Sequence, residues 1–138
     1  MPVTFNQINV GDTYSRHDLA QMWGYAGVEA ISRGVVTPRD DAKIVLFVTQ
    51  DKHPTATPYD DQLAESVLLW EGPNDHFGED RIVAHRNSQE EVHLFHRQSP
   101  TDDFTYSGQL ALWCFERRTN GPSRFAFRLQ HAPSDQPV

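Results

Sequence analysis

The sequence has very little cysteine, little lysine and no long hydrophobic run, and these shortages exclude whole classes of protein. A single cysteine, Cys114, cannot form an intramolecular disulfide or build a cysteine-based zinc site. It lies in the apolar run 110–115, so we expect it to fill the core rather than to act as a nucleophile. No apolar stretch approaches the roughly 18 residues of a membrane span, and residues 1–10 lack the pattern of a secretory leader. We therefore expect a cytoplasmic protein that makes no membrane contact.

Positive charge is also scarce. Twelve basic residues against 19 acidic ones give a net charge of -7. This argues against a protein that grips nucleic acid mainly by neutralising phosphates. Arginine clearly outnumbers lysine, and the guanidinium fork suits bidentate contacts with phosphates and base edges. Any nucleic-acid contact is therefore expected to be local, made by arginines that folding gathers on one side.

Catalytic signatures are missing as well. There is no G-x-S-x-G elbow and no catalytic-cysteine signature. His93 and His96 form an H-x-x-H pattern, but on a strand they point to opposite faces and cannot hold one ion. The sequence predicts no catalytic residue, no metal site and no cofactor, so we expect a binding module rather than an enzyme.

The elements that the pattern predicts are helical first and extended later. Ser15 is placed to cap a helix with Asp18 completing a capping box, and Gly24 supplies its stop. A second short helix is expected over 28–32. Strands are predicted where apolar residues run together or alternate, over 33–36, 43–49, 91–97, 104–115 and 124–129.

Length and order of elements predict one domain. With 138 residues there is room for a single core, which we place at 1–131, and the Pro-, Ser- and Asp-rich tail 132–138 is expected to be disordered. Five or six strands after one or two helices indicate an α+β fold, a small curved mixed β-barrel with the helices near its N-terminus. The connections 50–63 and 71–80 are long, which favours a functional role.

The central segment has the composition of a small polar pocket with an aromatic wall. It contains Tyr59-Asp60-Asp61 and then Trp70, without any helix or strand period. An aromatic ring stacks on a base, and a carboxylate accepts from an exocyclic amino group. Whether Trp70 belongs to the pocket or to the core stays open, whereas Trp23 and Trp113 are expected to pack in the core.

Several short motifs, in this order, carry a resemblance to a known family: Arg33-Gly34-Val35, Tyr59-Asp60-Asp61, Leu69-Trp70, Gly78 with Arg81-Ile82, and Phe104-Thr105-Tyr106-Ser107-Gly108. From Thr13 to Leu129 the chain resembles the domain of unknown function appended to bacterial superfamily II helicases with a phospholipase D-type nuclease domain, and to some HNH restriction endonucleases. That family is similar to the SET-and-RING-associated (SRA) and other PUA-like readers. These fold as small curved barrels and flip a modified base into a pocket.

The resemblance implies both a partner and a set of site residues. The partner would be double-stranded DNA with a modified base, with modified cytosine as the leading candidate. A nuclease or helicase domain would act beside the reader in modification-dependent restriction or phage defence. Tyr59, Asp60 and Trp70 would form the base pocket, and Arg33 and Arg81 would contact the nucleic-acid backbone. Helicase-linked members run W-Q-S after the tryptophan, whereas this chain has the more acidic Trp70-Glu71-Gly72.

Two other functions compete with this hypothesis. A protein-interaction or regulatory module of a helicase or nuclease system, with no base pocket, would suit the acidic net charge. Salt separates it from a reader, because DNA binding weakens steeply with ionic strength. The third possibility is a hydrolase that uses His85 with Asp60 or Asp80 on a nucleotide.

Overall fold

The computed structural model describes residues 4–38, 42–50, 62–64, 66–73 and 75–130. The expected tail and most of the 50–63 connection lie outside them. In chain order the elements are β1 Thr13–Tyr14, α1 Arg16–Met22, the 3-10 helix η1 Val28–Ile31, β2 Val35–Val36, β3 Lys43–Thr49, β4 Gln62–Ala64, β5 Val67–Glu71, α2 Glu79–Ser88, β6 Glu91–Arg97, β7 Phe104–Glu116 and β8 Arg124–Leu129.

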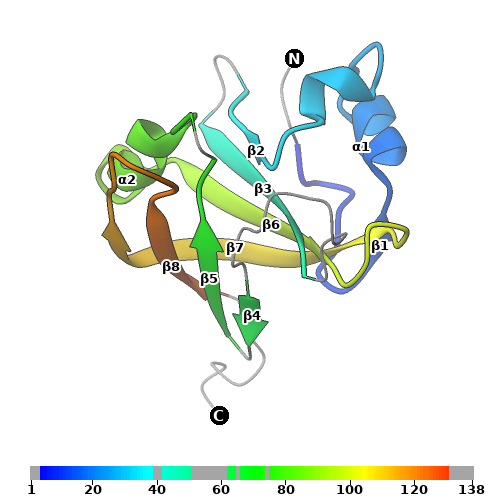
Figure 1. The fold of residues 1–138 in the computed structure, drawn as a ribbon. Coiled ribbons are helices and arrows are strands. Elements are labelled where there is room, and N and C mark those ends of the chain that lie inside the picture. Colours follow the sequence, from blue (N-terminus) through cyan, green and yellow to red (C-terminus); the bar gives the residue numbers. More distant parts are fainter. Residues whose placement is uncertain (1–3, 39–41, 51–61, 65, 74, 131–138) are drawn as a thin grey trace.

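One mixed sheet forms the body of the protein (Figure 1). Its strand order is β2-β3-β6-β7-β8-β5-β4, and β1 pairs with β7. Among the described strands, only β3 and β6 run parallel, and the other neighbours are antiparallel. The two described end strands, β2 and β4, are not paired with each other, so the sheet curls without closing. The expected curved mixed barrel with N-terminal helices is confirmed in this open form.

Local sequence signals determine the N-terminal part. The backbone N–H of Asp18 donates to the Ser15 hydroxyl at 3.0 Å, and the Ser15 N–H donates to the Asp18 carboxylate at 3.2 Å. The predicted capping box is therefore present. Gly24 follows with a φ of 79°, a left-handed conformation that glycine adopts without a Cβ penalty. The indole N–H of Trp23 donates to the Thr4 carbonyl, which ties the N-terminal segment to this helix.

Two hydrophobic clusters lie on opposite faces of β3. Ile44, Leu46 and Val48 belong to an inner cluster. Apolar side chains of β5, β7 and β8 and Ile82 of α2 complete this cluster inside the curled sheet. Val45 and Phe47 face an outer cluster built on α1, η1 and aromatic side chains of β6 and β7. Burial on both faces explains why 43–49 reads as a continuous apolar run instead of alternating.

Three expectations about individual segments are wrong. Residues 79–88 form α2, where no element was predicted. Trp113 is 54% exposed and Cys114 is exposed, although both were expected in the core. The register of β7 against β8 shifts between Leu112 and Cys114. This bulge turns the end of β7, so its apolar residues no longer continue the buried row.

No helix in the described part is long and apolar enough to span a membrane.

Candidate functional site

Trp70 lies near the end of β5 and points into the inner cluster. It is 4% exposed, and its ring centroid lies 5.4 Å from that of Phe125 and 6.2 Å from that of Phe127. Of the two roles left open by the sequence, the structure shows the packing role directly. Trp70 also contributes to the lining of a surface hollow at this end of the sheet.

Tyr59 and Asp60 fall in the segment 51–61, outside the described residues. The next described strand, β4, begins at Gln62. Gln62 pairs with Leu69 on β5, the neighbour of Trp70.

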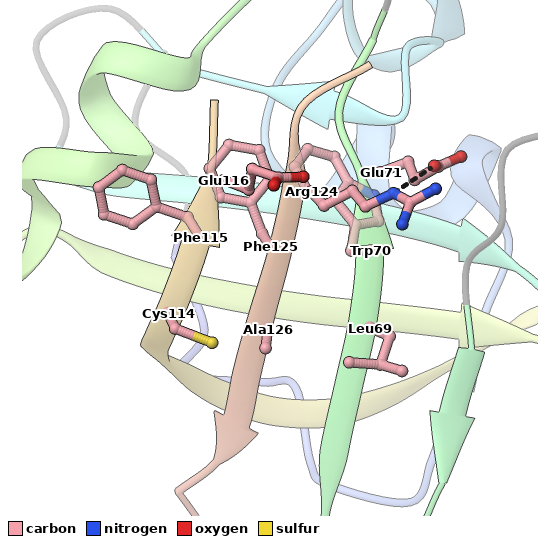
Figure 2. Close-up of a pocket in the computed structure, with 9 residues that line it drawn as sticks. All are labelled: Leu69, Trp70, Glu71, Cys114, Phe115, Glu116, Arg124, Phe125 and Ala126. Carbon is pink, nitrogen blue, oxygen red and sulfur yellow. Dashed lines mark hydrogen bonds and ion pairs between the residues drawn. The ribbon is translucent and has the colours of Figure 1, made fainter. Parts of the chain in front are cut away.

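The hollow lies across β7, β8 and β5 and has a volume of about 370 Å³, within the usual range for ligand sites of about 300–1,000 Å³. Figure 2 shows Leu69, Cys114 and Ala126 in one row, with Glu71, Arg124 and Glu116 in a row nearer the strand ends. The Arg124 Nε lies 3.3 Å from a Glu71 carboxylate oxygen. The hollow therefore has an apolar floor and a charged end. This combination suits a ligand with a flat apolar surface.

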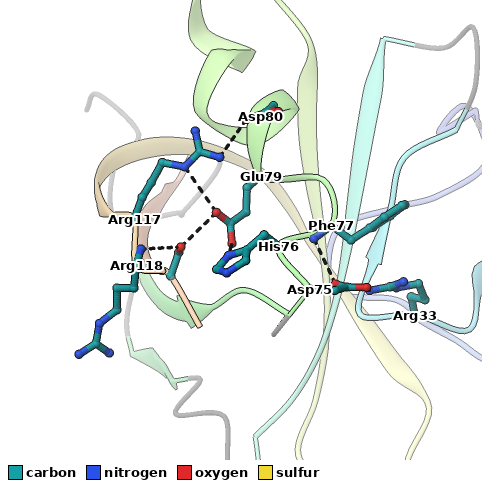
Figure 3. A network of polar contacts seen from close by, with 9 residues as sticks. Arg33, Asp75, His76, Phe77, Glu79, Asp80, Arg117 and Arg118 are labelled. Atoms are coloured by element: carbon teal, nitrogen blue, oxygen red, sulfur yellow. Dashed lines mark hydrogen bonds and ion pairs between the residues drawn. The ribbon is translucent and has the colours of Figure 1, made fainter. Parts of the chain in front are cut away.

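Of the two arginines expected to contact a nucleic-acid backbone, Arg33 has the more exposed side chain. Its guanidinium donates to both carboxylate oxygens of Asp75 at 2.9 Å and stacks over the ring of Phe77, 4.4 Å from the centroid (Figure 3). The side chain is 46% exposed. The hydrogen bond from Arg33, helped by the Phe77 N–H, lowers the pKa of Asp75 below its ordinary value. Arg33 therefore offers a charged plane at the surface, held by one exposed acid.

Arg81 is held more tightly. It forms an ion pair with Glu90 at 2.8 Å and also donates to the backbone carbonyls of Pro38 and Lys43. These contacts connect α2 to the start of β3. They occupy much of the guanidinium in the fold itself, which leaves Arg81 less available than Arg33 to a phosphate.

A buried carboxylate network, which sequence reasoning missed, connects α2 to the turn between β7 and β8. Glu79 is 1% exposed. Its carboxylate lies 2.7 Å from His76 Nδ1, accepts from the Ser123 hydroxyl at 3.0 Å, and lies 3.5 Å from Arg117 (Figure 3). The sequence does carry one sign of this helix start: Glu79 follows Gly78 directly. Acidic residues are favoured at helix N-termini.

The backbone next to this network is unusual. Gly78 has a φ of 80°, and a Cβ there would lie 3.0 Å from a methyl group of Val35. His76 also adopts a positive φ, of 60°, which is uncommon for a residue other than glycine. The exposed ring of Phe77 lies between these two left-handed residues. The loop is thus fixed by conformation at Gly78 and by hydrogen bonding at Glu79.

His85 lies in α2 with both ring nitrogens close to backbone groups. It is 5% exposed, its Nε2 accepts from the Leu112 backbone N–H at 3.1 Å, and its Nδ1 lies 3.2 Å from the Glu90 carbonyl. Nε2 therefore joins α2 to β7, and Nδ1 contacts the residue just before β6. Asp80 has a 92% exposed side chain and pairs with Arg117 instead. The pairing of His85 with Asp80 is wrong, and Asp60 lies outside the described residues.

The two histidines of the H-x-x-H pattern have separate partners. His93 is buried between the Tyr106 hydroxyl, 2.7 Å from Nδ1, and the Glu91 carboxylate, 2.8 Å from Nε2. Burial raises the pKa of Tyr106, so this hydroxyl stays protonated beside the histidine. His96 bonds to Gln50, and burial lowers its pKa. Among the described residues, no three His, Cys, Asp or Glu side chains are grouped to hold a metal.

The architecture and the open, curled sheet are those of an SRA domain, a PUA-like fold. No known family model matches the sequence, and no curated protein is similar to it. Solved structures do match. The SRA domain of SUVH5 in complex with fully methylated CG DNA superposes with a TM-score of 0.63 at 18% identity, covering 99% of this chain and 97% of that one.

Two further structures bear the same fold. The SUVH5 SRA domain with hemimethylated CG DNA gives a TM-score of 0.64 at 16% identity, covering 100% of this chain and 99% of that one. The DNA modification-dependent restriction endonuclease AspBHI gives 0.58 at 14% identity, covering 96% and 81%. At these identities the similarity establishes the fold, and the expected SRA-like fold is confirmed.

Proposed function

We propose that this protein recognises a modified nucleobase in double-stranded DNA, with modified cytosine as the leading candidate, and flips it into a pocket. The main support is the match of nearly the whole chain to SRA domains solved with methylated CG DNA and with hydroxymethylated CG DNA. The match to AspBHI supports a setting in modification-dependent restriction or phage defence. In this proposal catalysis belongs to a nuclease or helicase domain beside the reader.

The proposed pocket combines Tyr59 and Asp60 with the end of β5 at Trp70. Flipping a base costs a few kcal/mol of unstacking, and stacking on an aromatic side chain returns about 1–3 kcal/mol. Because Trp70 packs against Phe125, stacking on the base is assigned to Tyr59 in this proposal. Asp60 would accept a hydrogen bond from the exocyclic amino group of the base.

The first test is a titration of the protein with matched duplexes carrying cytosine, 5-methylcytosine, 5-hydroxymethylcytosine or N6-methyladenine. We expect tighter binding to one modified duplex. Tyr59→Ala should reduce that preference by about 5- to 150-fold, the equivalent of the lost stacking energy. Tyr25→Ala, a tyrosine on the α1 side, is the matched control and should keep the preference. Equal binding to all duplexes by the unaltered protein would reject the reader function and favour the protein-interaction module.

Arg33 is proposed as the main backbone contact, with Arg81 as a lesser one. A phosphate would replace Asp75 beside the guanidinium, so Arg33→Ala should weaken binding to every duplex equally. It should also reduce the slope of log K against log salt by about 1. Asp75→Asn should tighten binding, because it removes the competing acid. Arg124→Ala, another exposed and ion-paired arginine, is the control, and an equal slope change in it would refute the assignment.

A further inference from the structure

Two arginines at the outer cluster share one aromatic ring. The guanidinium carbon of Arg97 lies 4.2 Å from the ring centroid of Phe104, and that of Arg16 lies 5.1 Å from the same centroid. Arg16 also stacks over Phe47, at 4.7 Å. Arg16 is the first residue of α1, Arg97 the last of β6 and Phe104 the first of β7. Folding therefore brings two like charges onto one ring.

Neither guanidinium forms an ion pair with a carboxylate in the described part of the chain. Both side chains are half-buried. Other arginines do have carboxylate partners: Arg33, Arg81, Arg117, Arg118 and Arg124. The chain has 19 acidic residues against 12 basic ones, so acids are plentiful. The pair of Arg16 and Arg97 nevertheless stays uncompensated.

Burial and like-charge repulsion both act on this pair. Burial, together with the charge of Arg97, lowers the pKa of Arg16 to about 10. Burial also lowers the pKa of Arg97, and the charge of Asp102 partly offsets this. Arginine still stays charged at neutral pH. Two partly buried positive charges are unfavourable unless an opposite charge joins them.

The hydrogen bonds of the two arginines leave donors for an anion. Arg16 donates through Nε and Nη2 to two backbone carbonyls, at 3.0 and 3.3 Å. Arg97 donates through Nε to the Thr49 hydroxyl at 2.8 Å and through Nη1 to a backbone carbonyl of the turn between β6 and β7 at 3.3 Å. Among the described residues, Nη1 of Arg16 and Nη2 of Arg97 have no partner, and neither atom is fully buried.

A hollow of about 490 Å³ adjoins Arg97, and hydroxyl and amide side chains contribute to its lining: Thr13, Gln98 and Thr105. Two acids, Asp102 and Asp103, line it as well. The Asp102 carboxylate already accepts from the Ser99 N–H at 3.2 Å. These acids disfavour a broad polyanionic surface here, so the site suits one small oxyanion held at the two arginines.

We propose that Arg16 and Arg97 form a phosphate-binding site. Guanidinium groups bind phosphate oxygens through paired N–H donors, and stacking on Phe104 orients both planes before the anion arrives. A phosphate would supply the negative charge that the pair lacks. The phosphodiester of DNA and a free phosphate or nucleotide share this chemistry. The site concerns the phosphate alone, so the proposal goes beyond base recognition and does not depend on it.

The Nε–H signals of arginine side chains in NMR spectra of the 15N-labelled full chain test the site directly. Adding inorganic phosphate should shift the signals of Arg16 and Arg97 and leave that of Arg128 in place. Arg128 is the matched control, because it also stacks on an aromatic ring at 4.2 Å and has no ion pair among the described residues, but it is exposed. Arg97→Lys keeps the charge and should bind phosphate better than Arg97→Gln, although more weakly than the unaltered protein.

Duplex binding distinguishes the two sources of phosphate. If the ligand is the DNA backbone, Arg97→Gln should weaken binding of modified and unmodified duplexes alike by about 10-fold. The slope of log K against log salt should fall by about 1, and Arg128→Gln should change neither quantity. Phosphate-induced shifts without any change in duplex binding would assign the site to a free phosphate or nucleotide.

The absence of both responses, with amide spectra showing that the variants are folded, would overturn the proposal and leave Arg16 and Arg97 as structural residues. Arg97→Gln should keep the ratio of affinities between modified and unmodified duplexes. The base reader fails if the unaltered protein binds all duplexes equally, whereas the phosphate site fails if the arginines do not respond. The two failures can therefore be told apart.

Discussion

Trp70→Ala is expected to lower the free energy of unfolding by about 3–5 kcal/mol, the usual cost of removing a large aromatic from a core. The indole is 4% exposed and packs between the rings of Phe125 and Phe127 in the inner cluster. Domains of this size are stable by only about 5–15 kcal/mol, so the variant would lose much of its margin. Urea unfolding followed by far-UV circular dichroism measures the change.

The control is a second tryptophan on the same sheet. Trp113 is 54% exposed and contacts the Arg128 guanidinium, so Trp113→Ala should cost less than about 1 kcal/mol. Equal losses in the two variants would contradict the packing described for Trp70. Trp70→Phe keeps most of the buried ring, and loss of duplex preference in this folded variant would show that the indole itself also contacts the base.

The parts of the fold that sequence predicts are those determined by near neighbours. The capping box of Ser15 and Asp18 spans three residues, so the start of α1 follows from local chemistry. The strands β3, β6 and β8 match the predicted ranges, because their apolar residues are either continuous or alternate. In each case the deciding interactions leave a pattern in a short window of sequence.

Helix α2 leaves no such pattern. Among its residues with described burial, Glu79, Ile82 and His85 are buried. Two of these are polar and would not be assigned to an inner face. They are tolerated because Ser123 and Leu112, from distant segments, and His76, three residues before Glu79, provide hydrogen-bond partners. Since Ser123 and Leu112 become neighbours of α2 only after folding, no local reading could have supplied them.

The candidate site was only partly predictable for a similar reason. The strand predicted over 33–36 is observed over Val35–Val36, so Arg33 lies just before it, and Trp70 lies near the end of β5. The contact of Arg33 with Asp75 joins residues 42 positions apart. The outward turn of Trp113 follows from a bulge that the apolar run 110–115 conceals. The sequence therefore pointed to arginines in general as surface contacts. How exposed each arginine is depends on partners that are distant in the sequence.

The loop that carries Phe77 depends on the buried carboxylate that follows it. Glu79 holds His76 of this loop and Ser123 before β8 with the same side chain. Ser123 is fully buried, so its hydroxyl loses its acceptor in the core if the carboxylate is removed. The Arg117 guanidinium lies 3.5 Å from Glu79 and 2.8 Å from Asp80, and the hydrogen bond to Asp80 raises its pKa. Glu79 is thus the acceptor that these segments share.

Glu79→Ala is accordingly expected to lower the free energy of unfolding by about 2–4 kcal/mol, since one hydrogen bond to a charged group contributes about 1.5–3 kcal/mol. Urea unfolding measures this, and hydrogen exchange should show faster exchange over 75–80 and 117–123 than over α1. Asp80→Ala, at the exposed neighbouring acid, is the control and should cost less than about 1 kcal/mol. In a double-mutant cycle, Ser123→Ala should cost less in the Glu79→Ala background than alone, because its partner is already gone. Strictly additive losses would show that the two groups act independently, and that the loop bearing Phe77 is held by its backbone conformation at Gly78 instead.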